Sequence, residues 1–259
     1  MPEADNVLEV RGLQVRHAAR ATLQDVSLKV GRGEIVGLVG ESGSGKSTLA
    51  RAVASLFPAE AGEVWVMGRD WQRLSGAALR AQRRHLQLIF QDPLASLNPR
   101  MRIGEALAEP LRVFAPRKSD RERRDAVAVM LEKVGLNAAD SERMPGNFSG
   151  GQCQRIAIAR AMIAAPEILI CDEPVSSLDV SIQGQILNLL LDLQCDSGTS
   201  MVFISHDLAV VRSLCQRAYV LQSGRIVEHG VTASLFSSPR HPYTQELIAA
   251  ARGRLSFGQ

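Results

Sequence analysis

The 259-residue sequence has few aromatic residues, few cysteines and little net charge. Aromatic residues make up only 4%, which argues against a platform on which single-stranded bases stack. The net charge of +3 is too small to indicate nucleic-acid binding by bulk electrostatics, so we expect no nucleic-acid partner. The four cysteines form neither a CxxC pair nor a metal-like cluster. We therefore expect reduced, mostly buried thiols in a cytoplasmic protein.

Long hydrophobic runs are also missing. No stretch approaches the roughly 20 apolar residues that a membrane-spanning helix needs. The longest apolar-rich region, residues 156–171, is interrupted by Arg160, Pro166 and Glu167. The first residues have no basic flank followed by an apolar core, so we expect no signal peptide. The composition, 46% hydrophobic and 22% charged, indicates a globular chain that can bury a sizeable core. A peripheral role at a membrane stays open, because a partner could supply the spans.

Short apolar runs alternate with helical periodicity along most of the chain. Strands are predicted at residues 7–10, 22–30, 34–39, 86–90, 168–171 and 201–204. Residues 47–56 and an apolar stripe between 182 and 193 predict helices, while residues 218–221 and 225–228 predict a hairpin. Buried strands that alternate with helices predict an α/β core with a largely parallel sheet.

The region from about Asn98 to Ala165 has few strand signals. Ser119 and Glu122 have the spacing of a capping box at a helix start. Apolar residues then follow at i, i+3, i+4 and i+7 between 127 and 134, which places them on one helical face. We expect a mostly helical insert here.

The strongest motif is a glycine-rich loop between a predicted strand and a predicted helix. It fits the phosphate-binding pattern G-x-x-x-x-G-K-[ST] with Gly40, Glu41, Ser42, Gly43, Ser44, Gly45, Lys46 and Ser47, followed by Thr48. Glycines let backbone N–H groups close on phosphate oxygens, and the following helix adds its positive N-terminal dipole. We expect Lys46 to reach the β- and γ-phosphates of a nucleotide, and the Ser47 hydroxyl to ligate Mg²⁺. A chance glycine-rich turn is the alternative, and the strand before it and the helix after it argue against that.

Two acidic residues, Asp172 and Glu173, follow the apolar run at 168–171. Asp172 is expected to hold Mg²⁺, through a water molecule, and Glu173 to orient and polarise the attacking water. Alone, two acidic residues after an apolar run more often mark a solvated strand end. In a chain that also has a phosphate-binding loop, the metal-binding and catalytic interpretation is favoured.

A Ser-Gly-Gly turn and a histidine complete the candidate site. Ser149, Gly150, Gly151 and Gln152 open a predicted helix and offer N–H groups and a hydroxyl to an anion, although an ordinary helix start would look the same. His206 follows the strand at 201–204, where its imidazole is expected to contact the γ-phosphate, unless it is a surface residue.

Taken in order, these motifs, with Gln91 and the Ser177-Leu178-Asp179 segment, resemble the ATP-binding cassette (ABC) ATPases over roughly residues 7–250. The resemblance implies a P-loop NTPase (RecA-like) core with a mostly parallel sheet, an N-terminal antiparallel β-subdomain and a helical subdomain insert at about residues 92–165. Residues 251–259 would form a C-terminal tail.

The resemblance also implies roles for particular residues. Two cassettes would dimerise head to tail, so that Ser149, Gly150 and Gly151, with Gln152, contact the ATP held by the opposite subunit. Glu173, His206, Gln91 and Lys46 would be catalytic, and Gln91 would also sense Mg²⁺. Asp179 would lie at the subunit boundary, and His17 takes the place of an aromatic residue that stacks on adenine.

Two stretches are similar to a narrower group, the oligopeptide/dipeptide/nickel importer ATPases. They are FQDPLASLNPR at residues 90–100 and SPRHPYT at residues 238–244. This similarity implies an ATP-hydrolysing subunit at the cytoplasmic face of the membrane that energises the import of peptides, nickel or related small solutes. Its partners would be two transmembrane permease subunits, a second ABC ATPase subunit of the same or a different chain and, indirectly, an extracytoplasmic solute-binding protein.

One alternative function stays open at this point. A soluble ABC-type ATPase of a metabolic complex, such as the carbon–phosphorus lyase system, has similar C-terminal residues. The stretch at residues 92–100 favours the importer. The basic run at residues 112–124 is interpreted as a solvated helix face, and a contact with lipid or the permease is the alternative interpretation.

Overall fold

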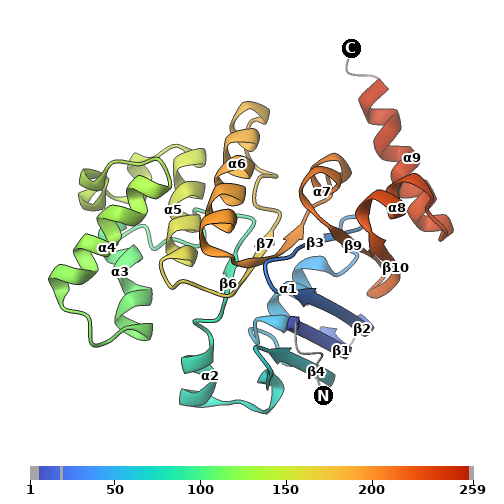
Figure 1. Ribbon diagram of the computed structural model, residues 1–259, viewed down its shortest axis with the longest axis horizontal. Coiled ribbons are helices and arrows are strands. Elements are labelled where there is room, and N and C mark those ends of the chain that lie inside the picture. Colours follow the sequence, from blue (N-terminus) through green and yellow to red (C-terminus); the bar gives the residue numbers. More distant parts are fainter. Residues whose placement is uncertain (1–5, 18–19, 257–259) are drawn as a thin grey trace.

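Figure 1 shows a computed structural model of the chain, which describes residues 6–17 and 20–256. The helices α3 (Ile103–Phe114), α4 (Asp120–Lys133) and α5 (Gly150–Met162) gather on one side, away from the C-terminal helix α9 (Pro242–Ser256). The larger of two sheets extends between them, and the smaller sheet lies below it in this view. Within the described ranges, no helix combines the length and the apolar character that crossing a membrane requires.

The larger sheet has the strand order β10-β9-β3-β8-β7-β6. Its strands are β3 (Ile35–Val39), β6 (Leu86–Ile89), β7 (Ile168–Asp172), β8 (Ser200–Ile204), β9 (Arg217–Gln222) and β10 (Arg225–Val231). Neighbouring strands are parallel except β9 and β10, which form the predicted antiparallel hairpin. Every residue of β3, β7 and β8 is buried, because helices and the second sheet cover both faces; this explains their unbroken apolar runs.

The second sheet is antiparallel, with the order β2-β1-β4-β5. It contains β1 (Asn6–His17), β2 (Arg20–Gly31), β4 (Ala61–Val66) and β5 (Arg69–Asp70). Buried side chains of this sheet, such as Leu13 and Val26, share one apolar core with Leu38 of β3 and Leu49 of α1 (Lys46–Val53). This core fixes α1, and the loop before it, against both sheets.

The remaining helices are α2 (Gly76–Gln82), α6 (Val180–Ser197), α7 (Leu208–Leu214) and α8 (Thr232–Ser237), with short 3₁₀ turns at Trp71–Arg73, Ala138–Glu142 and Pro145–Asn147. The predicted stripe on α6 is confirmed by buried residues such as Ile186 and Leu190. These side chains pack into the same apolar core as α5 and β7.

The predicted helical insert is confirmed. Its capping box is present, since the Glu122 N–H donates to Ser119 Oγ at 3.3 Å and the Ser119 N–H donates to Glu122 Oε2 at 2.6 Å. Val127 and Leu131 are buried on the predicted face of α4, and so is Val134, the residue that follows its last turn. Apolar packing among α3, α4 and α5 therefore holds this group of helices together.

Candidate active site

Four strands of the larger sheet end at one edge and deliver the candidate residues there. The glycine-rich loop follows β3, the Asp172–Glu173 pair closes β7, Gln91 comes two residues after β6, and His206 comes two residues after β8. All four strands run parallel, so their carboxyl ends meet at the same edge. Crevices outside this edge are the usual ligand sites of open α/β sheets.

The glycine-rich loop has a conformation that other residues cannot easily adopt. Gly40 and Gly45 have φ angles of +153° and +109°. A Cβ on Gly40 would lie 2.2 Å from the carbonyl oxygen of Leu221, so a side chain there would force the strand β9 to move. The Ser44 hydroxyl is buried, and no partner for it is found among the described residues.

Lys46 is held inside this loop. Its side chain is only 5% exposed, and Nζ donates to the carbonyl oxygens of Gly40 at 2.8 Å and Glu41 at 2.9 Å. Burial lowers the pKa of Lys46, while the negative charges of Glu173 and Asp172 oppose this shift. An ammonium group has three N–H donors, so one further bond can be made to a phosphate oxygen.

Ser47 and Asp172 form an oxygen-rich pair beside Lys46. The Ser47 hydroxyl donates to Asp172 Oδ1 at 3.0 Å, and Asp172 is buried. Burial raises the pKa of Asp172, whereas the hydrogen bond from Ser47 acts in the opposite direction. A hydroxyl and a carboxylate are the hard oxygen donors that Mg²⁺ prefers.

Glu173 lies at the centre of a second group of polar side chains. Gln91 Nε2 donates to Glu173 Oε2 at 3.1 Å, and His206 Nδ1 lies 3.3 Å from the same oxygen. Glu173 also has a φ of +48°, in the left-handed region that non-glycine residues rarely occupy. Such strained backbone is concentrated at functional sites, where it aims a side chain.

A cavity of about 460 Å³ joins the loop to this polar group. It is lined by Thr22, Ser42, Gly43, Gly45, Lys46, Ser47, Thr48, Gln91, Glu173 and His206. Most of the residues that line this cavity are therefore ones that the sequence motifs predicted. Thr22 was missed, because a lone threonine at the start of a predicted strand carries no signal.

Some predicted residues lie elsewhere. Gly40, Glu41 and Ser44 are not part of the cavity lining and form the back of the loop. His17 closes β1, and its side chain is outside the part of the chain whose side chains are described.

The Ser-Gly-Gly turn and Asp179 also do not line the cavity. Ser149 is the N-cap of α5 and forms a capping box with Gln152, as the sequence suggested for an ordinary helix start. Asp179 is the N-cap residue of α6. A Cβ on Gly151 would lie 2.7 Å from Ile182 Cγ2 of α6, so this glycine has a packing role as well.

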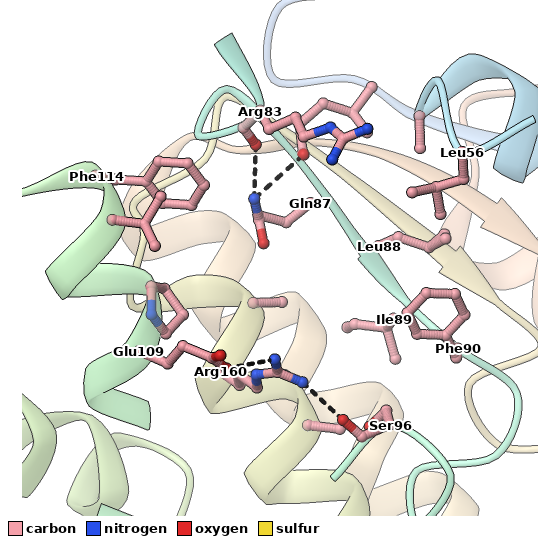
Figure 2. Close-up of a pocket in the computed structure, with 16 residues that line it drawn as sticks. Leu56, Arg83, Gln87, Leu88, Ile89, Phe90, Ser96, Glu109, Phe114 and Arg160 are labelled. Carbon is pink, nitrogen blue, oxygen red and sulfur yellow. Dashed lines mark hydrogen bonds and ion pairs between the residues drawn. The ribbon is translucent and has the colours of Figure 1, made fainter. Parts of the chain in front are cut away.

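A second cavity, of about 390 Å³, lies between β6, α3 and α5 (Figure 2). Arg160 crosses it, donating to the carbonyl oxygen of Ser96 at 2.7 Å and to Glu109 at 2.9 Å. Two apolar residues that are nearly half exposed, Leu56 and Val113, contribute to its lining. The cavity reaches Phe90, the neighbour of Gln91 in the sequence.

Known proteins resemble this chain in sequence and in structure. The sequence model of the family described as ABC transporter matches residues 23–176. The chain is 50% identical, over 228 residues, to the oligopeptide transport ATP-binding protein OppF of Haemophilus influenzae. This match covers 88% of the present chain and 69% of OppF. It is 52% identical, over 225 residues, to OppF of Escherichia coli, covering 87% and 67%.

Solved structures agree with the fold. A dimeric post-hydrolysis state of the ATP-binding cassette MJ0796, bound to ADP and Pi, superimposes with a TM-score of 0.77 at 27% identity, covering 87% of this chain and 98% of that one. The cbiO1 structure of Clostridium perfringens, part of the ABC transporter complex cbiONQ, gives a TM-score of 0.80 at 24% identity, covering 97% and 96%. The family model spans more than half of the chain, and the relatives are half identical to it over most of its length. The chain therefore belongs to the ABC transporter family, as an ATP-binding subunit that hydrolyses ATP.

Proposed function

We propose that this ATPase energises an importer of oligopeptides. The observation that carries the proposal is the single cavity that combines the phosphate-binding loop with Gln91, Glu173 and His206. The relatives named above are transport proteins for oligopeptides, which favours peptides over nickel or other small solutes. The similarity to these transport proteins also favours an importer over a soluble metabolic complex.

In the proposed mechanism the loop residues bind the triphosphate of ATP. Backbone N–H groups of the loop and the N-terminus of α1 face the phosphates, and Lys46 adds a positive charge to the β- and γ-oxygens. Ser47, Asp172 and Gln91 would hold Mg²⁺, because their hydroxyl, carboxylate and amide oxygens suit a hard cation. The metal, when bound, would neutralise charge on the phosphate oxygens.

Glu173 would act on the attacking water. Its carboxylate accepts a hydrogen bond from Gln91 and lies beside His206, so both neighbours restrict its orientation. A carboxylate held in this way can orient a water molecule and accept its proton. His206 would in addition donate to the γ-phosphate.

The site of one chain is incomplete in this proposal. Ser149, Gly150 and Gly151 sit at the start of α5 and do not line the cavity, so a second cassette would have to bring its own Ser-Gly-Gly turn to the nucleotide. Asp179 would lie at the boundary between the two chains, and His17 would stack on adenine. ATP would thus be enclosed between two subunits, of the same or different sequence.

The cavity in Figure 2 is proposed as the docking site for a cytoplasmic segment of the transmembrane permease. It has exposed apolar side chains at its rim and an ion pair, Arg160 with Glu109, inside it, a mixture typical of protein interfaces. Because Phe90 lines it and Gln91 follows directly in the chain, permease movement and γ-phosphate contacts would affect each other through this segment. The chain would then lie on the cytoplasmic face of the membrane, and an extracytoplasmic solute-binding protein would act on it only through the permease.

Reconstitution into proteoliposomes with the permease and binding protein tests this function. Uptake of a labelled oligopeptide is expected to require ATP. Val113→Glu, in the cavity lining, is expected to reduce uptake at least about tenfold, because a charge would have to be buried at the docking site. ATP binding by the isolated chain should stay unchanged. The control Val129→Glu changes a valine on α4 that is exposed to a similar degree, 54% against 48%, and should transport normally.

The outcomes separate the two parts of the proposal. A parent complex that binds ATP but takes up no peptide would refute the assignment of cargo. Normal uptake by Val113→Glu would refute the docking site alone.

A further inference from the structure

The segment at residues 238–244 fixes the start of α9 on the larger sheet. The N–H groups of Arg240 and His241 donate to the two carboxylate oxygens of Glu228, at 2.9 and 3.0 Å. Glu228 belongs to β10, and the Tyr243 N–H donates to His241 Nδ1 at 3.2 Å. These bonds give the first turn of α9 a defined position beside the phosphate-binding loop.

Tyr243 reaches from this helix to the loop. Its side chain is only 6% exposed, and its hydroxyl accepts a hydrogen bond from the Glu41 N–H at 2.9 Å, across 202 positions of sequence. The N–H of Glu41 and the carbonyl of Gly40 belong to the same peptide group. That carbonyl accepts the 2.8 Å bond from Lys46 Nζ. One peptide group is therefore bonded at both ends, by Tyr243 on one side and by Lys46 on the other.

We infer that Tyr243 is a positioning residue for ATP binding: it fixes the Gly40–Glu41 peptide group and, through the carbonyl, the Lys46 ammonium. A peptide group bonded at its N–H is a better acceptor at its oxygen, because hydrogen bonds in a chain polarise one another. A loop that is already ordered loses less conformational entropy when the phosphates bind. This inference rests on the proposed role of Lys46 at the phosphates, and it gives the C-terminal segment SPRHPYT a task in the ATPase site.

The test compares the two tyrosines of the chain. Tyr243→Phe removes only the hydroxyl. Tyr219→Phe is the control: Tyr219 is 4% exposed, and its hydroxyl accepts from the Lys29 N–H at 3.0 Å and donates to the Lys29 carbonyl oxygen at 3.4 Å, in β2. Both variants should lower the melting temperature of the full chain, and Tyr219→Phe at least as much as Tyr243→Phe, since it loses two hydrogen bonds to backbone and Tyr243→Phe loses one.

Only Tyr243→Phe is expected to weaken binding of Mg-ATP, measured by calorimetry on the full chain. The dissociation constant should rise roughly three- to tenfold, which corresponds to about 0.7–1.4 kcal/mol. In the assembled transporter the KM for ATP should rise while kcat changes less than about twofold, because the bond acts on binding rather than on the chemical step. An unchanged dissociation constant, or an equal loss in Tyr219→Phe, would overturn the inference.

A double-mutant cycle with Lys46→Ala tests the path through the lysine. If Tyr243 acts through Lys46, removing its hydroxyl should change ATP affinity much less in the Lys46→Ala background than in the parent. Equal effects in both backgrounds would overturn this path. A parent chain that does not bind ATP would refute the proposed function as well, whereas a parent that binds it normally confines any failure to Tyr243.

Discussion

Replacing Glu173 with glutamine separates ATP binding from ATP hydrolysis in the proposed site. The substitution keeps the shape of the side chain and removes its charge and its basicity. The oxygen that accepts the 3.1 Å bond from Gln91 Nε2 can be kept by the new amide, so the neighbouring side chains need not move. The phosphate contacts proposed for the glycine-rich loop and the start of α1 are untouched.

The expected magnitude follows from the role of the carboxylate. A positioned general base contributes about 10²–10⁴-fold to a rate, or about 2.7–5.5 kcal/mol of barrier height. Turnover in the assembled transporter should fall by at least about a hundredfold. Affinity for ATP should be equal to that of the parent or higher, because one negative charge beside the phosphates has been removed.

Phosphate release and equilibrium ATP binding are the two measurements. Glu34→Gln is the control, since Glu34 precedes β3 at the opposite edge of the sheet and bonds to Arg217 instead of facing the nucleotide cavity. The control should hydrolyse ATP at the parent rate. Turnover by Glu173→Gln above about a tenth of the parent rate would refute the assignment of Glu173 as the base.

Two further predictions concern stability. Gly151→Ala is expected to lower the free energy of unfolding by about 1–2 kcal/mol, because its Cβ would lie 2.7 Å from Ile182 Cγ2. Gly184→Ala, within α6 and with open space for the Cβ, should instead raise it by up to about 1 kcal/mol; urea denaturation measures both, and a stabilised Gly151→Ala would contradict the packing argument. For Glu34, burial alone raises the pKa, but bonds from Arg217 and the Gly31 N–H outweigh it, so the net pKa is lowered. A carboxylate whose pKa is lower in the folded chain than in the unfolded chain stabilises the fold at pH values above its unfolded-state pKa. This stabilisation is lost as the pH falls through the folded-state pKa. The parent should therefore exceed Glu34→Gln in stability by about 1–2 kcal/mol at pH 7, with the difference shrinking below about pH 4.3; a difference that grows in acid would show the sign to be wrong.

The strands of the larger sheet could be predicted because their surroundings leave a simple pattern. β3, β7 and β8 are buried on both faces, so their residues are almost all apolar, with Asp172 at the end of β7 and Ser200 at the start of β8 as the exceptions. β4 was missed, because only Val64 and Val66 of its six residues are buried and the exposed positions interrupt the pattern. Strand interiors covered on one face give a weaker signal than those covered on both.

The candidate site divides in the same way. Lys46 and Glu173 were predicted because their motifs are local and each motif ends a strand. Thr22 and Tyr243 were not, since their contacts with the loop depend on how distant segments pack. In particular, the segment SPRHPYT could be recognised as a motif, but only the fold brings its tyrosine to Glu41.

The position of the Ser-Gly-Gly turn gives a physical reason why the proposed closure should depend on ATP. In the single chain the Ser149 hydroxyl accepts the Gln152 N–H at 3.3 Å, a long bond that can be exchanged at low cost. The N-terminus of α5, a helix of 13 residues, presents a partial positive charge that nothing in the cavity of its own chain uses. A γ-phosphate held by a second cassette would supply the matching negative charge, whereas ADP ends one phosphate short of it. Two cassettes would then attract one another across the nucleotide while ATP is intact and separate after hydrolysis, and that change in separation is what could move a permease docked beside Gln91.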